Sequence, residues 1–407
     1  MSVIKIGLGH DSDPVTAARL AMENTPRPQL AIVFSAFSID PEQTHRALRE
    51  VLGETPIFGG TSAGEFSSIA DAPREDSVVV MTLQSSYLSA GVGIGRNLST
   101  APEACAREAV QEAYSNLQPN PAVMSLMTIA MDQKGAEASR IRPYVNLILP
   151  DGSTSKEEPF MRVLLEETGT GSQVVGGSSA NDFKADHTWQ FGREAVRDGA
   201  VVAALSSGLK MGTAMGHPYF PSNKGAVVTR ASGRTVYELD RRPAVEVLRN
   251  LIGSDELDFD TFAQHPFGIK SSDVFGEYTI KSAAAVNEDG SIGFLAEIPE
   301  GAYLRYMQSD RGYAIASFKK TLEKAMADAG RPKRVAAVIV FNCILRHLLK
   351  CRLEVDDLAI VREVCGEDTA LIGFNTFGEQ GMTRGGSLGH YNQTATILVI
   401  GDELITQ

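Results

Sequence analysis

The stretch Ile57-Phe58-Gly59-Gly60-Thr61-Ser62-Ala63-Gly64-Glu65 decides how this chain can fold, because two similar stretches follow it. They are Val174-Val175-Gly176-Gly177-Ser178-Ser179-Ala180-Asn181-Asp182 and Leu371-Ile372-Gly373-Phe374-Asn375-Thr376-Phe377-Gly378-Glu379. Each runs from apolar residues through glycine and small polar side chains to a carboxylate. Glycine permits a sharp turn, and Ser, Thr and Asn can bind a ligand or the turn itself. Three such loops predict a duplicated architecture that gathers polar loops around a site.

The residues around each loop repeat as well. The first unit is predicted as strand 2–9, helix 14–23, strand 29–37, helix 41–52, the first loop and strand 77–83. The second is predicted as strand 89–95, helix 101–116, strand 123–130, helix 157–167, the second loop and strand 200–205. A degenerate third unit comprises helix 312–329, strand 334–341, helix 355–364, the third loop and strand 394–400. This alternation predicts an α/β fold of duplicated strand-helix-strand units, with mixed sheets flanked by helices.

Two further segments interrupt the units. Residues 132–160 are rich in proline, which predicts a long loop or lid over the site. Residues 227–301 contain a strand at 234–240, a helix that begins at Pro243 and an Asp-Gly hairpin turn at 287–290.

The chain is expected to form two domains. Pro, Ser, Asn and Gly cluster at residues 218–225, which places the boundary there. The first domain then spans residues 1–220, with pseudo-repeats at about 1–88 and 89–220, and the second spans 221–407.

Composition narrows the class of protein. The 407 residues are 43% hydrophobic and 22% charged, as in an ordinary soluble globular protein. Lys+Arg 38 against Asp+Glu 50 gives a net charge of −12 without basic clusters, which argues against nucleic acid or an anionic membrane as partner. The start of the chain lacks the pattern of a secretion signal, and the longest apolar run, 335–341, is too short to span a membrane. With four widely spaced cysteines, these features predict a cytoplasmic protein.

Five stretches of the sequence resemble the motifs of a known protein family. The first loop resembles the signature of the N-terminal half of FIST proteins, and four further stretches resemble their C-terminal half. These are Val236-Tyr237-Glu238-Leu239-Asp240 with Pro243-Ala244, Phe341-Asn342-Cys343 with Arg346, the third loop, and His390-Tyr391-Asn392-Gln393-Thr394. Together the matches cover residues 28–401.

The resemblance implies a signal-transduction module that binds small ligands, with amino acids as a suggested class. In some members the module binds haem and reports nitric oxide. No kinase, receiver or helix-turn-helix segment is recognisable in the chain. We therefore expect a free-standing sensor without catalysis of its own, which signals through a separate protein such as a histidine kinase or a cyclic-dinucleotide enzyme.

The third loop supplies the main candidates for ligand binding. Glu379, with Thr376 beside it, could hold an ammonium or a hydroxyl, or could instead cap a helix or pair with an arginine. Glu65 and Asp182 occupy the same register in the other two loops. Either all three carboxylates anchor turns, or one binds a ligand while two are scaffold.

The end of strand 334–341 supplies a second group, because α/β proteins place ligand groups at such ends. Arg346 could grip a carboxylate with its guanidinium, as the family motif implies. We expect a pocket lined by Cys343, Arg346, Thr376, Glu379, and His390 or Asn392, with Thr61, Ser62, Glu65, Ser179 and Asp182 contributed by the N-terminal loops. Opposite charges in one pocket would suit a zwitterionic amino acid.

Other chemistries remain as alternatives. A haem would need an axial ligand, for which His187 and His217 are the candidates. A cysteine- or carboxylate-dependent hydrolase would use Cys343, His347 and Glu379, although Cys343 is also an ordinary core thiol. Cys343, His347 and Cys351 are spaced four apart, but they match none of the usual zinc patterns, so no metal is expected. The glycines between Gly91 and Gly95 lack the order of a dinucleotide loop.

Overall fold

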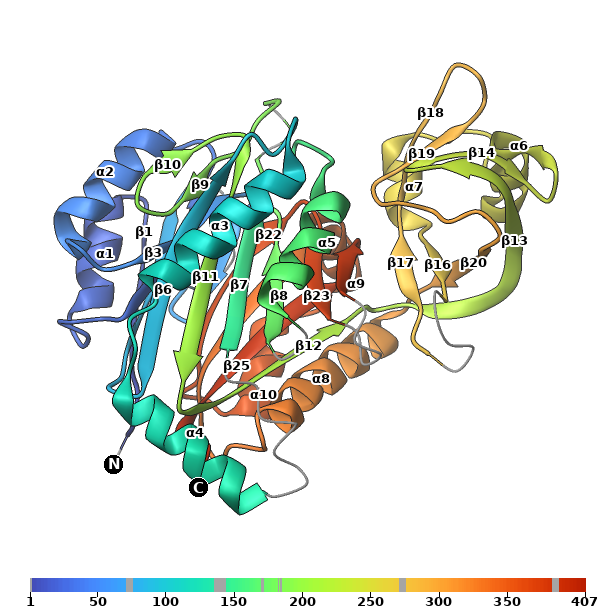
Figure 1. Cartoon of the computed structure of the whole chain (residues 1–407). Coiled ribbons are helices and arrows are strands. Elements are labelled where there is room, and N and C mark those ends of the chain that lie inside the picture. Colours follow the sequence, from blue (N-terminus) through green and yellow to red (C-terminus); the bar gives the residue numbers. More distant parts are fainter. Residues whose placement is uncertain are drawn as a thin grey trace.

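The computed structural model describes residues 2–70, 76–134, 144–169, 172–181, 183, 185–270, 276–382 and 388–407. These residues form three α/β units and one inserted β domain, which lies to the right of the units in Figure 1. The predicted α/β fold with mixed sheets flanked by helices is therefore confirmed. Within the described ranges, no helix is long and apolar enough to cross a membrane.

The two helices of the first unit begin at the residues that the sequence predicts. Its elements are β1 (Lys5–Asp11), α1 (Pro14–Met22), β2 (Leu30–Ala36), α2 (Pro41–Leu52), β3 (Ile57–Ser62) and β5 (Val78–Gln84). The Asp13 and Asp40 side chains accept hydrogen bonds from the first turns of α1 and α2, and a proline follows each of them. The strand order is β1-β5-β2-β3, with β2 and β3 parallel.

The second and third units repeat this order. The second consists of β6 (Leu88–Arg96), α3 (Pro102–Asn116), β7 (Tyr144–Pro150), α5 (Glu157–Thr168), β8 (Gln173–Gly177) and β11 (Gly199–Ser207), in the order β6-β11-β7-β8. The third consists of β12 (Leu209–Gly216), α8 (Arg311–Asp328), β21 (Val335–Cys343), α9 (Ile344–Leu353), α10 (Asp357–Cys365), β22 (Ala370–Thr376) and β25 (Ala395–Leu404), in the order β12-β25-β21-β22. The predicted duplication is thus a threefold repeat, and the third unit is complete once β12 is included.

Short strands link the three units in a cycle. After its loop, the first unit sends β4 (Glu65–Ser67) to pair with β22 of the third unit. The third unit sends β23 (Glu379–Met382), extended by β24 (Leu388–Tyr391), to β8 of the second. The second sends β9 (Gln190–Phe191), extended by β10 (Ala195–Val196), to β3 of the first. Each unit therefore completes the sheet of another.

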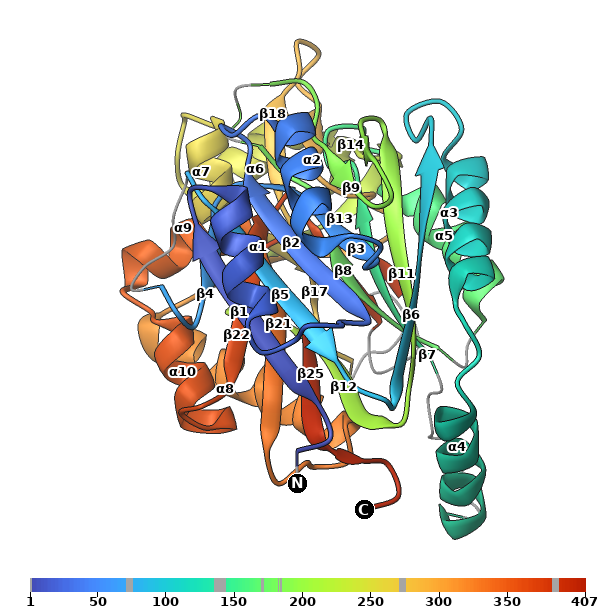
Figure 2. The ribbon, with the colours of Figure 1, turned by 90° about the vertical axis from the view of Figure 1, so that its left-hand side faces the viewer.

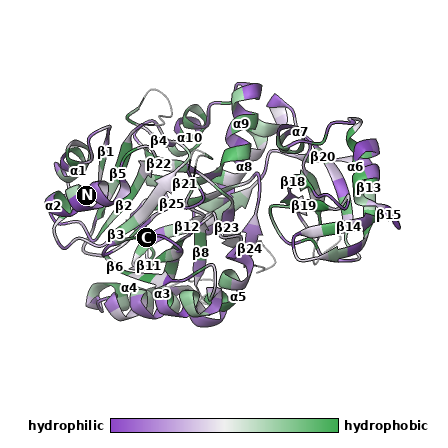
Figure 3. Cartoon of the chain, turned by 90° about the horizontal axis from the view of Figure 1, so that it is seen from above, coloured by the Kyte–Doolittle hydropathy of each residue, from purple (hydrophilic) through white to green (hydrophobic). Residues whose placement is uncertain are grey.

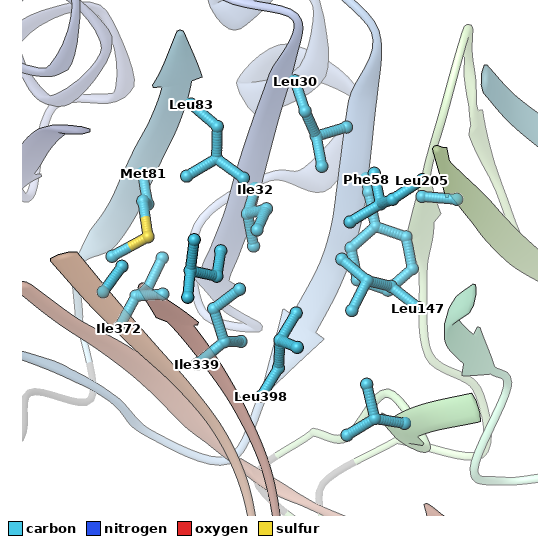
Figure 4. Packing of buried hydrophobic residues seen from close by; sticks show 14 of the residues in the cluster. Leu30, Ile32, Phe58, Met81, Leu83, Leu147, Leu205, Ile339, Ile372 and Leu398 are labelled. Carbon is cyan, nitrogen blue, oxygen red and sulfur yellow. The ribbon is translucent and has the colours of Figure 1, made fainter. Parts of the chain in front are cut away.

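The inner faces of the three sheets share one apolar core. Seen from above, the sheets surround a common centre (Figure 3). Buried side chains from all three units fill that centre (Figure 4), among them Leu30, Ile32, Phe58, Leu147, Leu205, Ile339 and Leu398. The outer faces are covered by α1 with α2, α3 with α5, and α8 with α10 (Figure 2). Because both faces are covered, the central strands are apolar throughout.

The inserted domain separates β12 from α8 of the third unit and has its own core. Its strands are β13 (Phe220–Ser232), β14 (Thr235–Leu239), β15 (Arg242–Pro243), β16 (Phe267–Ile269), β17 (Thr279–Lys281), β18 (Ala283–Val286), β19 (Ile292–Phe294) and β20 (Tyr303–Gln308). Its helices are α6 (Ala244–Ile252) and α7 (Phe259–Gln264). The expected hairpin turn joins β18 to β19, where Asn287 N donates to Ser291 O at 2.8 Å.

Two predictions for the second unit were wrong. The expected strand 123–130 lies within a helix, α4 (Pro121–Lys134), near the chain termini (Figure 1). The expected lid contains β7, a buried central strand, at residues 144–150. The helix was missed because apolar residues lie on all its sides and hide the helical period. The strand was missed because Pro143 and Pro150 suggested a loop, although Pro150 is only its last residue.

The glycines in the first strands have a packing role. A Cβ on Gly9 would lie 1.9 Å from Ala17 O in α1, and one on Gly93 would lie 2.2 Å from Ala109 O in α3. The glycines therefore let each helix lie directly on its strand. This close approach explains why the first two units share the pattern, and no dinucleotide is needed to account for it.

We expect Gly93→Ala to destabilise the protein by about 1–3 kcal/mol, because α3 must move away from β6. Gly293→Ala is the control, since a Cβ there would meet nothing closer than Ala285 O at 3.8 Å. Urea unfolding measures both variants. Equal stability of the two would contradict the packing role of Gly93.

Candidate ligand site

The three repeated loops meet where the parallel strands end. Loop two bonds to loop one, loop one to loop three, and loop three to loop two. The ring is closed by backbone hydrogen bonds from Ala180 N to Thr61 O (2.9 Å), from Ala63 N to Asn375 O (3.0 Å) and from Ser178 N to Gly378 O (2.8 Å). The architecture thus brings together the polar loops that the sequence singled out.

Glu65 anchors the first loop from the inside. Its carboxylate is fully buried and accepts hydrogen bonds from Ser62 Oγ at 2.5 Å and Ser77 Oγ at 2.6 Å. Nε2 of the buried His10 lies 2.7 Å from the same Ser77 hydroxyl. Desolvation, partly offset by these hydrogen bonds, raises the pKa of Glu65 to about 7.

Glu379 is held in the same way in the third loop. It is fully buried and accepts hydrogen bonds from the hydroxyl of Thr376 and from Thr394 Oγ1 at 2.6 Å. Desolvation raises the pKa of Glu379 to about 8. Both carboxylates therefore have internal partners that close their loops.

Gln190 takes the corresponding place in the second unit. In the sheet pairing, Glu65 lies opposite Phe374, Glu379 opposite Gly177, and Gln190 opposite Gly60, which are equivalent positions of the repeat. The Gln190 amide donates to Ser179 Oγ at 2.8 Å. Asp182, which the loop alignment placed in this register, lies outside the described residues. Alignment of the three loop sequences could not identify Gln190 as the equivalent residue, because more residues separate the second loop from the strand that follows it, β9, than in the other two units.

Arg346 is engaged by a carboxylate of its own unit. Its Nη1 and Nη2 lie 2.7 and 3.1 Å from the two oxygens of Asp357, and Lys350 Nζ lies 2.6 Å from Asp357 Oδ2. Burial would raise the pKa of Asp357, but the charges of Arg346 and Lys350 lower it to about 2. The guanidinium thus lies in a buried ion pair, away from the cavity described next.

A cavity of about 120 Å³ lies between the loop ring and the inserted domain. The second unit contributes Gly152, Ser155, Glu157 and Phe183; the third contributes Cys343, Ile344, Leu345, Phe377 and Asn392; the inserted domain contributes Arg234, Phe259 and Leu295. Of the residues expected to form the pocket, Cys343 and Asn392 line this cavity. Arg346, Thr376, Glu379 and His390 do not line it.

Charged residues that the sequence did not indicate form one wall. Arg234 Nη2 lies 2.7 Å from Glu157 Oε2 and 2.5 Å from Glu158 Oε2. Behind them, desolvation lowers the pKa of the buried Lys281 to about 8. Desolvation also lowers the pKa of His390, whose Nδ1 lies 3.0 Å from Gln380 Nε2. Acidic residues in the first turn of a helix are common, so Glu157 carried no signal of a partner in another domain.

Of the groups proposed for hydrolysis, the Cys343 thiol interacts with Glu379, while His347 hydrogen-bonds to a different cysteine. Burial raises the pKa of the Cys343 thiol well above its ordinary range. His347 Nε2 lies 3.5 Å from Cys351 Sγ, and desolvation lowers the pKa of His347 to about 4. Across the described ranges, no group of three or more His, Cys, Asp or Glu side chains could hold a metal ion.

The histidines considered for haem are already engaged. His217 is partly buried beside a cavity of about 280 Å³, and Tyr219 N donates to its Nδ1 at 3.3 Å, while the ring also bonds to the Tyr278 backbone. His187 pairs with Asp186 at 2.9 Å and keeps about a third of its side chain exposed.

Arg346→Ala should destabilise the fold by about 3–5 kcal/mol, because it leaves Asp357 buried without its main partner. Arg352→Ala, an exposed position on the same helix, is the control and should cost less than about 1 kcal/mol. Chemical denaturation distinguishes the two. Unchanged stability in Arg346→Ala would contradict the structural role.

The raised pKa of Glu379 predicts a contribution to stability that is lost as pH rises from about 4.5 to 8, opposite in sign to that of histidines with lowered pKa values such as His347 and His390. The folded protein holds a proton on Glu379 in this range, where the unfolded chain has released it, so ionisation favours unfolding. The loss amounts to a few kcal/mol, at about 1.4 kcal/mol per pKa unit. Glu379→Gln should flatten this pH dependence, and the exposed Glu363→Gln should not. Urea unfolding at pH 5 and pH 8 gives the free energy of unfolding of the unmodified protein and of both variants. If this free energy changed equally between the two pH values in all three proteins, the prediction would be refuted.

Comparison with known protein families identifies two domains in the chain. Residues 29–242 match the FIST N domain and residues 244–382 match the FIST C domain. An uncharacterized protein of Methanocaldococcus jannaschii is 24% identical over 319 residues, which cover 72% of this chain and 55% of that protein, so the chain spans about half of that relative's length.

A solved structure also aligns with the whole chain. The crystal structure of cyanuric acid hydrolase from A. caulinodans aligns over 98% of this chain and 99% of its own, with 8% identity and a TM-score of 0.37. This likeness is too low to support any statement about function. FIST domains are associated with signal-transduction sensors that bind small ligands. Since the two domain matches together cover most of the sequence, the chain belongs to the FIST family.

Proposed function

We propose that this protein is a cytoplasmic sensor that binds a small ligand, an amino acid, in the cavity between the loop ring and the inserted domain. It catalyses no reaction and signals through a separate protein, such as a histidine kinase or a cyclic-dinucleotide enzyme. The acidic composition without basic clusters is consistent with a soluble partner.

The observation that carries the proposal is the composition of the cavity wall. Arg234, Phe259 and Leu295 come from the inserted domain, whereas the other lining residues come from the second and third units. A ligand in this cavity touches both bodies at once. If it binds one placement of the inserted domain better than another, it shifts the population between them. A partner protein that binds one placement of the inserted domain better than the other would respond to that shift.

The charges at the cavity suit a zwitterion. Glu157 offers a carboxylate to an ammonium group, and Arg234 offers a guanidinium to a carboxylate. The two already pair with each other, so the charges at the cavity wall are balanced, and a zwitterion, which carries no net charge, would preserve that balance. The small volume also limits the ligand to a compact molecule.

The same geometry argues against the hydrolase alternative. The raised pKa of Cys343 keeps the thiol protonated, and a thiol is a poor nucleophile. His347 bonds to Cys351 instead of Cys343. The cavity therefore supports binding better than covalent chemistry.

A thermal-shift screen of the twenty amino acids should find at least one that stabilises the protein. A ligand at 100 times its Kd contributes about 2.7 kcal/mol, which is a readily measured rise in Tm. The rise should be lost in Arg234→Ala, which removes the guanidinium from the cavity.

Arg230→Ala is the matched control, because this arginine is exposed in the same domain and pairs with Glu238. Its Tm rise should match that of the unmodified protein. A stabiliser that acts equally on Arg234→Ala would place the ligand elsewhere. No stabiliser in the whole screen would refute the amino-acid proposal.

A further inference from the structure

The amino end of α9 faces the cavity and has only a sulfur atom as a nearby side-chain acceptor. Ile344 and Leu345, its first two residues, line the cavity. The Cys343 thiol lies next to the N–H groups of Leu345 and Arg346, but sulfur is a weak acceptor and the contact lacks the geometry of a capping hydrogen bond. The first turn also contains no acidic residue. By contrast, an aspartate caps α1, α2, α7, α8 and α10. The first N–H groups of a helix need acceptors and carry partial positive charge, which favours an anion.

Asn392 provides an independent indication of a ligand. It lines the cavity, yet only 1% of its surface is exposed. Its Oδ1 accepts a long hydrogen bond from Ser282 N at 3.4 Å, and its NH₂ group has no hydrogen-bond partner among the described residues. Buried amide donors are nearly always bonded. An acceptor in the cavity would supply the missing bond.

Apolar side chains form another part of the wall. Phe377 and Phe183 stack with their ring centroids 4.8 Å apart, and Phe259 lies 6.0 Å from Phe183. Phe183 is 59% exposed and Phe259 is 36% exposed, so the cavity opens toward solvent at these rings. Exposed aromatic rings at the mouth of a cavity favour a ligand with an apolar group to cover them.

We infer that the cavity recognises a small carboxylate that carries a bulky apolar group. The carboxylate accepts hydrogen bonds from the α9 backbone and from the Asn392 amide in place of Arg234, which is already paired with Glu157 and Glu158, and the apolar group covers the phenylalanine rings. This inference rests on the proposed function, since it names the ligand class of the same cavity.

The acidic residue in the cavity does not oppose a carboxylate there. Glu157 is paired through Oε2 with Arg234 at 2.7 Å, and its Oε1 accepts from Ser178 Oγ at 3.4 Å. Its charge is therefore compensated without the ligand. An amino group on the ligand would add a contact to Glu157, but it is not required by the helix end or by Asn392.

Isothermal titration calorimetry of the full chain with four probes tests the inference. Phenylalanine and 3-phenylpropionate carry both a carboxylate and a ring, phenylalaninamide lacks the carboxylate, and alanine lacks the ring. The first two should bind, and the other two should bind at least tenfold more weakly, because each loses one of the two recognised groups.

Two variants assign the recognition to the cavity. Asn392→Asp should weaken 3-phenylpropionate at least tenfold through charge repulsion, while Asn287→Asp, in the exposed hairpin turn, should leave binding unchanged. Phe259→Ala, at an exposed position that tolerates truncation, should weaken the same probe, and Tyr303→Ala, exposed elsewhere in the same domain, should not. If Asn392→Asp does not fold, the comparison of Phe259→Ala with Tyr303→Ala still tests whether the probe binds in the cavity.

The outcomes separate the two claims. Binding of 3-phenylpropionate but of no amino acid would support the carboxylate site and refute the amino-acid ligand. Stabilisation by small or polar amino acids alone, lost in Arg234→Ala, would support the proposed function and overturn this inference. Equal binding of phenylalanine and phenylalaninamide, or no binding of any ring-bearing carboxylate, would overturn it as well.

Discussion

The structure depends on the exchange of short strands among the three units. β4, β9 and β23 each leave their own unit and hydrogen-bond to the last parallel strand of another. Because the exchange runs in a cycle, no unit has a complete sheet alone. The same crossing draws the three repeated loops together, since each loop leads from its own unit to the next. The polar ring and the shared apolar core are thus two results of one connection pattern.

The ring explains why similar loop residues have different roles. Glu65 and Glu379 lie inside their loops and hold them closed, so the strand crossing is enough to account for their shared position in the repeat. The cavity forms beside the ring, where the inserted domain adds Arg234 to the edge of the second and third units. A threefold scaffold has gained its candidate binding site where one unit carries an insertion that the others lack.

Local pattern was enough to predict most elements, because central strands with both faces buried are continuously apolar and aspartate-proline pairs mark α1 and α2. It failed at α4, which is apolar on every side, and at β7, which lies between prolines. The cavity was only partly predictable. Cys343 and Asn392 lie within recognisable motifs, whereas Arg234 and Glu157 are 77 positions apart in the chain and meet only through tertiary structure.

The cyclic strand exchange also affects the order in which the chain can fold during synthesis. When the first unit has left the ribosome, the edge of β3 that pairs with β9 is still unpaired, because β9 is synthesised much later. The edge of β8 in the second sheet is likewise unpaired until β23, near the end of the chain, has been synthesised. Until then, β3 and β8 present unpaired edges of the kind that promote aggregation. The two sheets of the nascent protein can therefore be completed only after the late residues have been made.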